Sequence, residues 1–201
     1  MTKRHPEQDL VTAEDFFLLV PDGQKADLID GVIYMASPDN IDSDQIGGFI
    51  KFLIQGFAEA RGLGGKVFGS CFAFQMSETR APEPDIAYVS AGRLHLVEKT
   101  KMIGGPDIAV EIVSRDSRQR DYLEKKNLYQ EAGVEEYWII DPMQRRAEFH
   151  RLHERIYQLV PLEQNRIFRS SVLEGFWLDV EWLFADPLPS AFEKLREILG
   201  L

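Results

Sequence analysis

The stretch from residue 107 to residue 141 constrains the fold of this chain more than any other part of the sequence. Residues 107–114 are mostly apolar, which predicts a central β-strand. Apolar side chains at helical spacing then predict a helix over about residues 117–132, closed by Gly133. Residues 136–141 form the next apolar run. This order predicts a strand–helix–strand unit in the middle of the chain.

The flanking segments add strands and helices to this unit. Asp30-Gly31 between two β-prone runs is a strong hairpin signal, and Thr12 is a suitable helix N-cap. The further expected elements cover residues 13–18, 26–29, 32–35, 43–60, 66–69, 71–74, 85–89, 146–152 and 156–160, with a C-terminal helix after Ser190. Together they predict an α+β fold with an α/β-like core, in which helices flank a mixed central sheet.

The length of 201 residues predicts one domain, because no linker or internal repeat divides the chain. Within residues 1–201 we expect an N-terminal helix and hairpin (12–42), a core that carries the site (43–142), and a C-terminal hairpin and helix (143–201). No apolar run approaches the roughly 20 residues of a membrane span. Residues 1–6 lead into polar residues rather than the apolar core of a signal peptide, so a cytoplasmic location is expected.

Composition limits the classes of function. The single cysteine, Cys71, excludes a disulfide framework or a cysteine zinc cluster within one chain, and its apolar neighbours predict a core position. The 33 acidic and 23 basic residues give a net charge of -10, which argues against a strongly basic nucleic-acid-binding protein. An enzyme that handles phosphate through a metal remains compatible with this charge, because carboxylates build such a site and the bound cation reverses the local field.

Glu111 is a carboxylate on a strand that otherwise reads as buried. Side chains alternate across a strand, so Glu111 shares one face with Asp107, Ala109 and Val113. A buried carboxylate costs several kcal/mol unless it is paired or binds a cation. The strand alone leaves both interpretations open, a structural salt bridge or a functional carboxylate.

A lysine and an aspartate of the following helix point toward the same sheet. At about 100° per residue, Tyr122, Leu128 and Tyr129 define the apolar face of this helix. Lys125 falls in the middle of that face, and Asp121 also lies on it. The alternative is an ordinary i,i+4 ion pair worth a few tenths of a kcal/mol, but a solvent-exposed pair would more naturally occupy the opposite face.

Pro84 and Asp85 stand at the start of a predicted strand. Proline fits there because the first residue of a strand need not donate a ladder hydrogen bond. Asp85 would then lie at the strand entrance, although this dipeptide alone is more often a turn than a ligand. Gln75 and Glu83 are close in sequence and are candidates to support the same site.

These features occur in an order that resembles a known family. The relevant residues are Pro84-Asp85, Glu111-Ile112-Val113-Ser114, Asp121, Lys125, Tyr129, the block 133–142, and the first hairpin, DLIDGVIYMASP, over residues 27–38. From about Thr12 to Leu183 the pattern resembles the Uma family, described as restriction endonucleases, within the PD-(D/E)XK nuclease superfamily. The resemblance implies a restriction-endonuclease-like core, with a mixed central sheet flanked by helices.

The resemblance also implies residue roles. Asp85 and Glu111 would be the metal ligands, for Mg²⁺ or Mn²⁺, and the three catalytic residues would be Asp85, Glu111 and Lys125. The superfamily lysine usually stands two residues after the second acid, where this chain has Val113; the Uma family commonly shows this departure and takes its lysine from the next helix. Asp121 would hold Lys125 in place.

Two further groups of residues are candidates for supporting roles. The family often has a histidine near the start of the first long helix, where this sequence reads Asp-Ser-Asp-Gln over residues 42–45, so the resemblance assigns no role there. Arg115, Arg118 and Arg120 follow the central strand. They would either contact phosphate or form a solvated helix start.

Three functions are consistent with these features. The first is a metal-dependent endonuclease that hydrolyses DNA phosphodiester bonds through the Asp-Glu-Lys site, working as a homodimer, since two-fold dimers are the commonest oligomers. The second is a catalytically inactive nuclease-fold binding or assembly module, which the negative net charge and the lack of a clear basic groove favour. The third is a metal hydrolase that acts on another phosphate ester. The intact Asp-Glu-Lys set favours the first.

Overall fold

A six-stranded mixed sheet forms the centre of the protein. The structure is a computed structural model that describes residues 10–21, 23–38 and 40–201. The strands of the sheet are β3 (Lys66–Phe68), β5 (Ile86–Val89), β7 (Ile108–Ile112), β8 (Glu136–Asp141), β9 (Arg146–His153) and β10 (Ile156–Leu159). Their order is β10-β9-β8-β7-β5-β3. Only β7 and β8 are parallel among these neighbours; the other pairs are antiparallel.

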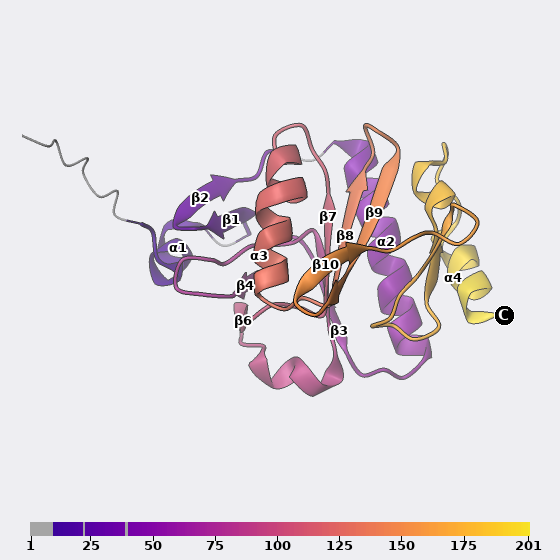
Figure 1. Ribbon diagram of the computed structural model, residues 1–201, viewed down its shortest axis with the longest axis horizontal. Helices are drawn as coiled ribbons and strands as arrows, with labels where there is room; N and C mark the ends of the chain where they lie inside the picture. Colours follow the sequence, from indigo (N-terminus) through magenta and orange to yellow (C-terminus); the bar gives the residue numbers. More distant parts are fainter. Residues whose placement is uncertain (1–9, 22, 39) are drawn as a thin grey trace, which may run out of the picture.

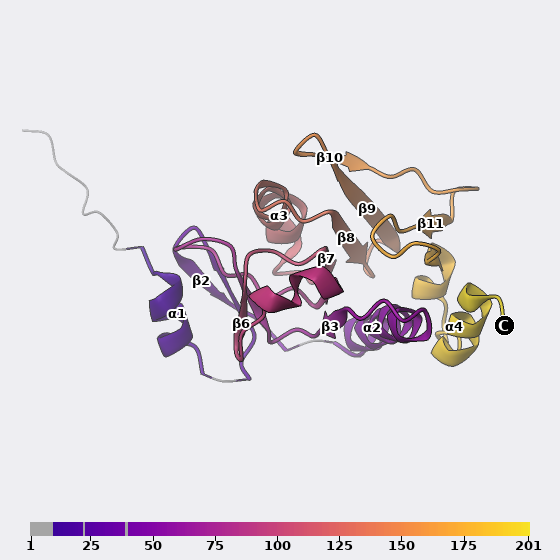
Figure 2. The ribbon, with the colours of Figure 1, turned by 90° about the horizontal axis from the view of Figure 1, so that it is seen from below.

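Helices cover both faces of this sheet (Figures 1 and 2). The long helix α2 (Ile41–Ala60) lies on one face, and a helical segment made of η2 (Arg120–Lys125) and α3 (Lys126–Glu131) lies on the other. That segment connects β7 to β8, as a parallel pair requires a crossover connection. The C-terminal helix α4 (Ala191–Leu199) packs against α2. The expected α+β fold with its strand–helix–strand unit is confirmed.

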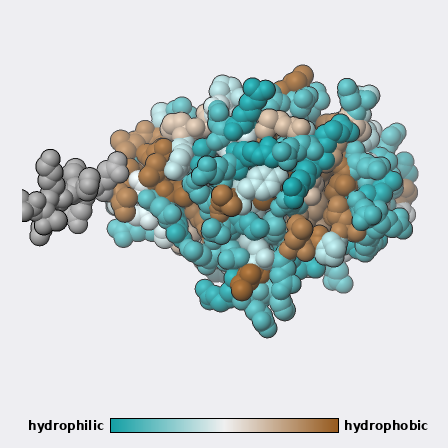
Figure 3. Space-filling view, turned by 45° about the horizontal axis from the view of Figure 1, so that its top comes forward, coloured by the Kyte–Doolittle hydropathy of each residue, from teal (hydrophilic) through white to brown (hydrophobic). Residues whose placement is uncertain are grey.

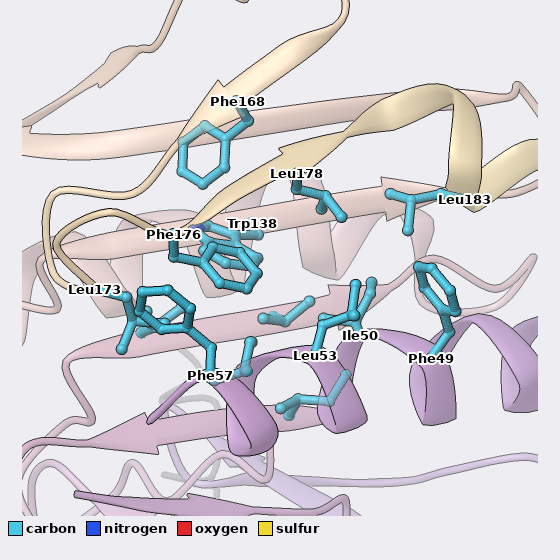
Figure 4. Close-up of a cluster of buried hydrophobic side chains, with 14 of the residues drawn as sticks. Phe49, Ile50, Leu53, Phe57, Trp138, Phe168, Leu173, Phe176, Leu178 and Leu183 are labelled. Atoms are coloured by element: carbon cyan, nitrogen blue, oxygen red, sulfur yellow. The ribbon is translucent and has the colours of Figure 1, made fainter. Parts of the chain in front are cut away.

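The larger hydrophobic core fills the space between α2 and the sheet (Figure 4). Phe57 of α2 meets Phe176 edge to face, with ring centroids 5.4 Å apart. Phe176 in turn stacks on Trp138 of β8, and Phe168 meets the same indole edge to face. Fully burying each such side chain contributes about 1.5–3 kcal/mol. The helix therefore owes its place to the apolar stripe that its sequence predicts.

The first hairpin is fixed above the opposite face by local turn chemistry and by one strand-like bridge. It consists of β1 (Ala26–Ile29) and β2 (Val32–Met35), preceded by α1 (Ala13–Leu19). Asp30 and Gly31 both have positive φ, 47° and 77°, as a tight two-residue hairpin turn requires. Leu28 exchanges backbone hydrogen bonds with Ala81. This bridge holds β1 close to the entrance of β5.

The remaining elements are short. They are β4 (Ala73–Gln75), β6 (Lys101–Ile103), β11 (Ile167–Arg169), β12 (Trp177–Asp179) and the 3-10 helices η1 (Ala91–Leu96) and η3 (Val180–Phe184). The strands form the pairs β4-β6 and β11-β12. The sequence did not predict β6, β11 or β12, because three residues are too few to show an alternating pattern.

The prediction that Cys71 lies in the core is wrong. Cys71 is exposed, because Ser70 and Cys71 form a turn and the expected strand begins only at Ala73. Its thiol lies 3.7 Å from the carbonyl oxygen of Gly23. The apolar residues that are buried in this segment are Ala73 and Phe74 of β4.

The outer surface is mainly hydrophilic on the face that Figure 3 shows, with apolar side chains gathered at the end formed by α1 and the first hairpin. Exposed large apolar residues there are Leu18, Leu19, Val32 and Met35. Within the described residues, no helix is both long and apolar enough to cross a membrane. The expectation for residues 1–6 lies outside the described residues.

Candidate active site

Glu111 is buried on β7, with its side chain on the face opposite α2. Only 2% of the residue is exposed. Its oxygen Oε1 accepts a hydrogen bond from the Tyr129 hydroxyl at 2.8 Å and contacts the Lys125 ammonium at 2.9 Å. The sequence left a structural salt bridge and a functional carboxylate as alternatives for Glu111. The salt bridge with Lys125 is present. Whether Glu111 can also bind a metal depends on the residues around this pair.

Lys125 is the centre of a group of three carboxylates. Its Nζ lies 2.8 Å from Asp27 Oδ2, 2.9 Å from Glu111 Oε1 and 3.9 Å from Asp121 Oδ1. All four side chains are at least nine-tenths buried. Charges at these distances interact strongly where water is excluded, so the lysine and the acids depend on one another for their ionised forms.

The helical segment turns Asp121 and Lys125 inward through a π-helical stretch. Residues Arg120–Lys125 form η2, in which the helix is wider than an α-helix. The Tyr137 hydroxyl of β8 donates to the Asp121 carbonyl oxygen at 2.8 Å, so the sheet also holds this turn. Short π-helical turns are frequent at functional sites. Both side chains lie on the face that the helical spacing predicts.

Asp85 lies beside Glu111 because of strand register. β5 and β7 pair antiparallel with Ile86 opposite Val110, and one step further along this register Asp85 faces Glu111. Asp85 Oδ2 accepts a hydrogen bond from the Ile112 backbone N–H at 2.6 Å. The Pro-Asp dipeptide, weak as a signal by itself, therefore places its carboxylate next to the buried glutamate.

Two residues at the start of the first hairpin, one on β1 and one directly before it, complete the group, and the sequence assigned neither of them a role. Asp27 of β1 contacts Lys125, as described above, and Lys25 forms an ion pair with Asp85 Oδ1. Glu83 also belongs to this region, because its backbone N–H donates to Asp27 Oδ1 at 2.9 Å. The one available signal was Asp27 itself, a carboxylate in an otherwise apolar four-residue strand.

Burial shifts the pKa values of the acids in this group. Burial raises the pKa of Glu111 to about 8, although the Lys125 charge opposes this. Burial likewise raises the pKa of Asp121 to about 6 against the same lysine. Burial lowers the pKa of Lys125, but Asp27, Glu111 and Asp121 outweigh it and raise that pKa well above its usual value. Lys125 is therefore a permanent cation at neutral pH.

A cavity of about 1040 Å³ opens onto these side chains. Its walls include the site residues Lys25, Asp27, Asp85, Glu111, Asp121 and Lys125, together with Arg115 and Arg120. Arg118 instead pairs with Asp141 at 3.1 Å, and Gln75 accepts a hydrogen bond from Lys101. The structure thus brings together the four predicted site residues and Arg115, and directs Arg118 and Gln75 to other partners.

The oxygen donors fit a hard divalent cation. Asp85 and Glu111 line the same cavity, and Asp85 already forms an ion pair with the cationic Lys25. In the described part of the chain, hydrogen bonds reach Oε1 of Glu111 but not its second oxygen. No cluster of three or more His, Cys, Asp or Glu side chains suited to a metal occurs among the described residues. Two carboxylates with water and phosphate are a ligand set that Mg²⁺ accepts.

Comparison with known proteins identifies the family. Residues 13–181 match Uma2, a family described as "Putative restriction endonuclease". The chain belongs to the Uma2 family. The resemblance on which the sequence analysis relied is confirmed, and membership supports a nuclease function for this Uma2 protein.

A solved structure shares the Uma2 fold. It is the crystal structure of a "putative nuclease belonging to DUF820" from Anabaena variabilis. The match has a TM-score of 0.71 and 18% sequence identity, and covers 87% of this chain and 97% of the other. No curated protein matches the sequence. At this identity the likeness establishes the fold, and the roles of individual residues in the Uma2 chain rest on their own geometry.

Proposed function

We propose that this Uma2 protein is a metal-dependent endonuclease that hydrolyses DNA phosphodiester bonds. The observation that carries the proposal is that Asp85, directly before β5, and Glu111 of the neighbouring strand β7 line one cavity, with Lys125 held against Glu111. Two carboxylates and a cation beside an open cavity are what hydrolysis of an anionic ester requires, since the site must hold a metal and balance the charge of the phosphate.

Asp85 and Glu111 would hold Mg²⁺ or Mn²⁺ in this proposal. The ion, when bound, lowers the pKa of a coordinated water and neutralises charge on the scissile phosphate. The chain contributes the positions of the two carboxylates. The Ile112 backbone N–H orients Asp85, while the Tyr129 hydroxyl and Lys125 bind one oxygen of Glu111 and leave the other without a hydrogen bond among the described residues.

Lys125 acts in this site through its charge. An ammonium group that stays protonated at neutral pH cannot accept a proton, so it does not serve as a general base. Its charge opposes the rise that burial causes in the pKa of Glu111, and so favours the ionised carboxylate, and it adds positive charge beside the phosphate. Asp121 and Asp27 hold the lysine in place from two other elements.

The substrate and the assembly belong to the same proposal. Arg115 lines the cavity and is exposed, so it can contact a DNA phosphate. Arg118 could reach the same backbone only by leaving Asp141. We propose a homodimer, because cleavage of both strands of a duplex suits a two-fold arrangement of sites.

A second candidate is a nuclease-fold binding module without catalysis. Lys25 forms an ion pair with Asp85, one of the two proposed metal ligands. The chain also carries a net charge of -10, which opposes DNA binding. In that case Lys25 and Lys125 neutralise the acids permanently. The two candidates differ in whether a metal ion can displace Lys25.

Nicking of supercoiled plasmid with Mg²⁺, Mn²⁺ or EDTA tests the proposal. We expect metal-dependent nicking by the wild type and its loss in Glu111→Gln and Lys125→Ala. Glu174→Gln and Lys99→Ala serve as matched controls, because both residues are exposed and neither lines the cavity. Nicking that persists in both site variants would show that the site is wrongly placed. If folded wild type nicks no DNA, single-stranded, duplex or branched, the binding module becomes the better conclusion.

A further inference from the structure

A smaller groove lies directly beside the acidic cavity. Its volume is about 250 Å³, and it shares Ser43, Ser70, Asp85 and Ile112 with the larger cavity. The groove continues away from Asp85 along α2 and the turn after β3. Its other walls include Gly47, Gly48, Lys51 and Gly69. A chain that enters the active site can therefore continue into this groove.

The wall that α2 contributes lacks side chains in its middle. Asp44, Gly47, Gly48 and Lys51 follow one another at i, i+3, i+4 and i+7, so they share one face of the helix. Among the described residues, a Cβ at Gly48 would have no atom within 4 Å, and one at Gly47 would meet only Ile112 at 4.0 Å. Glycine inside a helix is unfavourable relative to alanine. Two of them on an open face suit the close approach of a ligand to the helix backbone.

Ser43 supplies a buried hydroxyl group at the junction of the two hollows. The residue is 5% exposed. Its hydroxyl oxygen is buried and forms no hydrogen bond to any described residue. Buried polar groups in folded proteins usually have a hydrogen-bond partner, so this hydroxyl has bonding capacity to offer. The hydroxyl can donate to an anionic oxygen in the groove.

Lys51 supplies the positive charge. Within residues 10–21, 23–38 and 40–201 it forms no ion pair. Its Nζ lies over Gly69, so close that a Cβ at that position would be 2.9 Å away. The exposed Asp44 on the rim opposes an anion, but water and salt screen its charge.

We propose that this groove binds a backbone phosphate of the DNA strand next to the scissile one, with Lys51 pairing with its charge and Ser43 donating to one of its oxygens. The inference rests on the proposed nuclease function and adds a binding subsite to it. The bare helix surface at Gly47 and Gly48 lets the sugar-phosphate chain lie close to α2. This subsite gives an acidic protein a local phosphate contact outside the metal site.

Binding of a fluorescein-labelled DNA duplex, followed by anisotropy at several salt concentrations, tests the subsite. Ca²⁺, which carboxylates also bind, is present to neutralise the acidic site. We expect Lys51→Gln to bind DNA several-fold more weakly than the wild type. The plot of log K for DNA binding against log salt concentration has a negative slope. In Lys51→Gln this slope should become shallower by about 0.9, the value for one phosphate contact. Lys51→Arg should restore both, and Lys99→Gln should match the wild type.

The outcomes separate the subsite from the nuclease proposal. Unchanged affinity and salt slope in Lys51→Gln would overturn the subsite, even if the wild type nicks plasmid. A wild type that does not bind the duplex would overturn it as well. A wild type that binds through Lys51 but does not nick plasmid would keep the subsite and overturn the proposed catalysis.

Discussion

Lys125 Nζ lies 2.9 Å from Glu111 Oε1, and this contact joins the helical segment to the central strand where both residues line the cavity. Two more acids, Asp27 and Asp121, contact the same ammonium. One cation therefore organises carboxylates from three separate elements. The stability of the fold and the proposed chemistry both depend on this group.

Removing the cation should destabilise the fold. We expect Lys125→Met to lower the free energy of unfolding by about 3–5 kcal/mol near pH 8, because three buried carboxylates lose their partner. The loss should be smaller near pH 5, where protons neutralise the acids whose pKa values burial raises. Urea denaturation at both pH values measures this. An equal loss at both would contradict coupling between the lysine and the acids.

Glu83 should make stability fall as pH rises. Burial raises its pKa from 4.5 to about 7 in the folded protein. Between these values the folded state binds a proton that the unfolded state has lost, so the free energy of unfolding decreases with pH, by at most about 3 kcal/mol. Glu83→Gln should match the wild type near pH 5 and be more stable near pH 8. Urea denaturation of both proteins at the two pH values would reveal the difference, and parallel pH profiles would contradict it.

The metal and Lys25 should compete for Asp85. The ammonium of Lys25 pairs with Oδ1 of the carboxylate that we propose as a ligand. Lys25→Gln should therefore bind Mn²⁺ more tightly than the wild type in isothermal titration calorimetry. Asp85→Asn should bind it more weakly. Weaker binding by Lys25→Gln would mean that Lys25 supports the metal site instead of competing with it.

Replacing Gly48 with alanine should raise the stability of the protein and weaken its binding of DNA. Its helical backbone conformation accepts an alanine, and a Cβ there meets no atom of the described residues within 4 Å. Gly48→Ala should stabilise the protein by about 0.5–1 kcal/mol through helix propensity, while its methyl group narrows the proposed phosphate groove. Thermal unfolding and duplex binding together measure the two effects. A stabilised variant with unchanged affinity would show that DNA does not approach this part of α2.

The Tyr129 hydroxyl should help to keep Glu111 ionised. It donates to Oε1, and a hydrogen bond to a charged group contributes about 1.5–3 kcal/mol. Tyr129→Phe should therefore require a higher pH for Mn²⁺ binding than the wild type, because the carboxylate ionises less readily. Calorimetric titrations from pH 6 to 9 test this, with Tyr34→Phe as a control for the loss of a hydroxyl. Identical pH dependence in Tyr129→Phe would contradict the assignment.

The sequence by itself determined the features that local periodicity encodes. Alternation along the central strand placed Glu111 on one face, and helical spacing turned Lys125 and Asp121 toward it. The Asp30-Gly31 turn fixed the first hairpin through its backbone preference. These patterns repeat within a few residues, so they can be read without knowing what packs against them.

The tertiary structure alone decided which distant groups meet. Lys25 meets Asp85 across 60 residues of sequence, and Asp27 meets Lys125 across 98 residues. Both contacts form only because β1 lies against the entrance of β5. The exposure of Cys71 also depended on a turn that its apolar neighbours did not reveal. Burial of a charged cluster requires several elements to dock at once, and side-chain periodicity within one element carries no information about that docking.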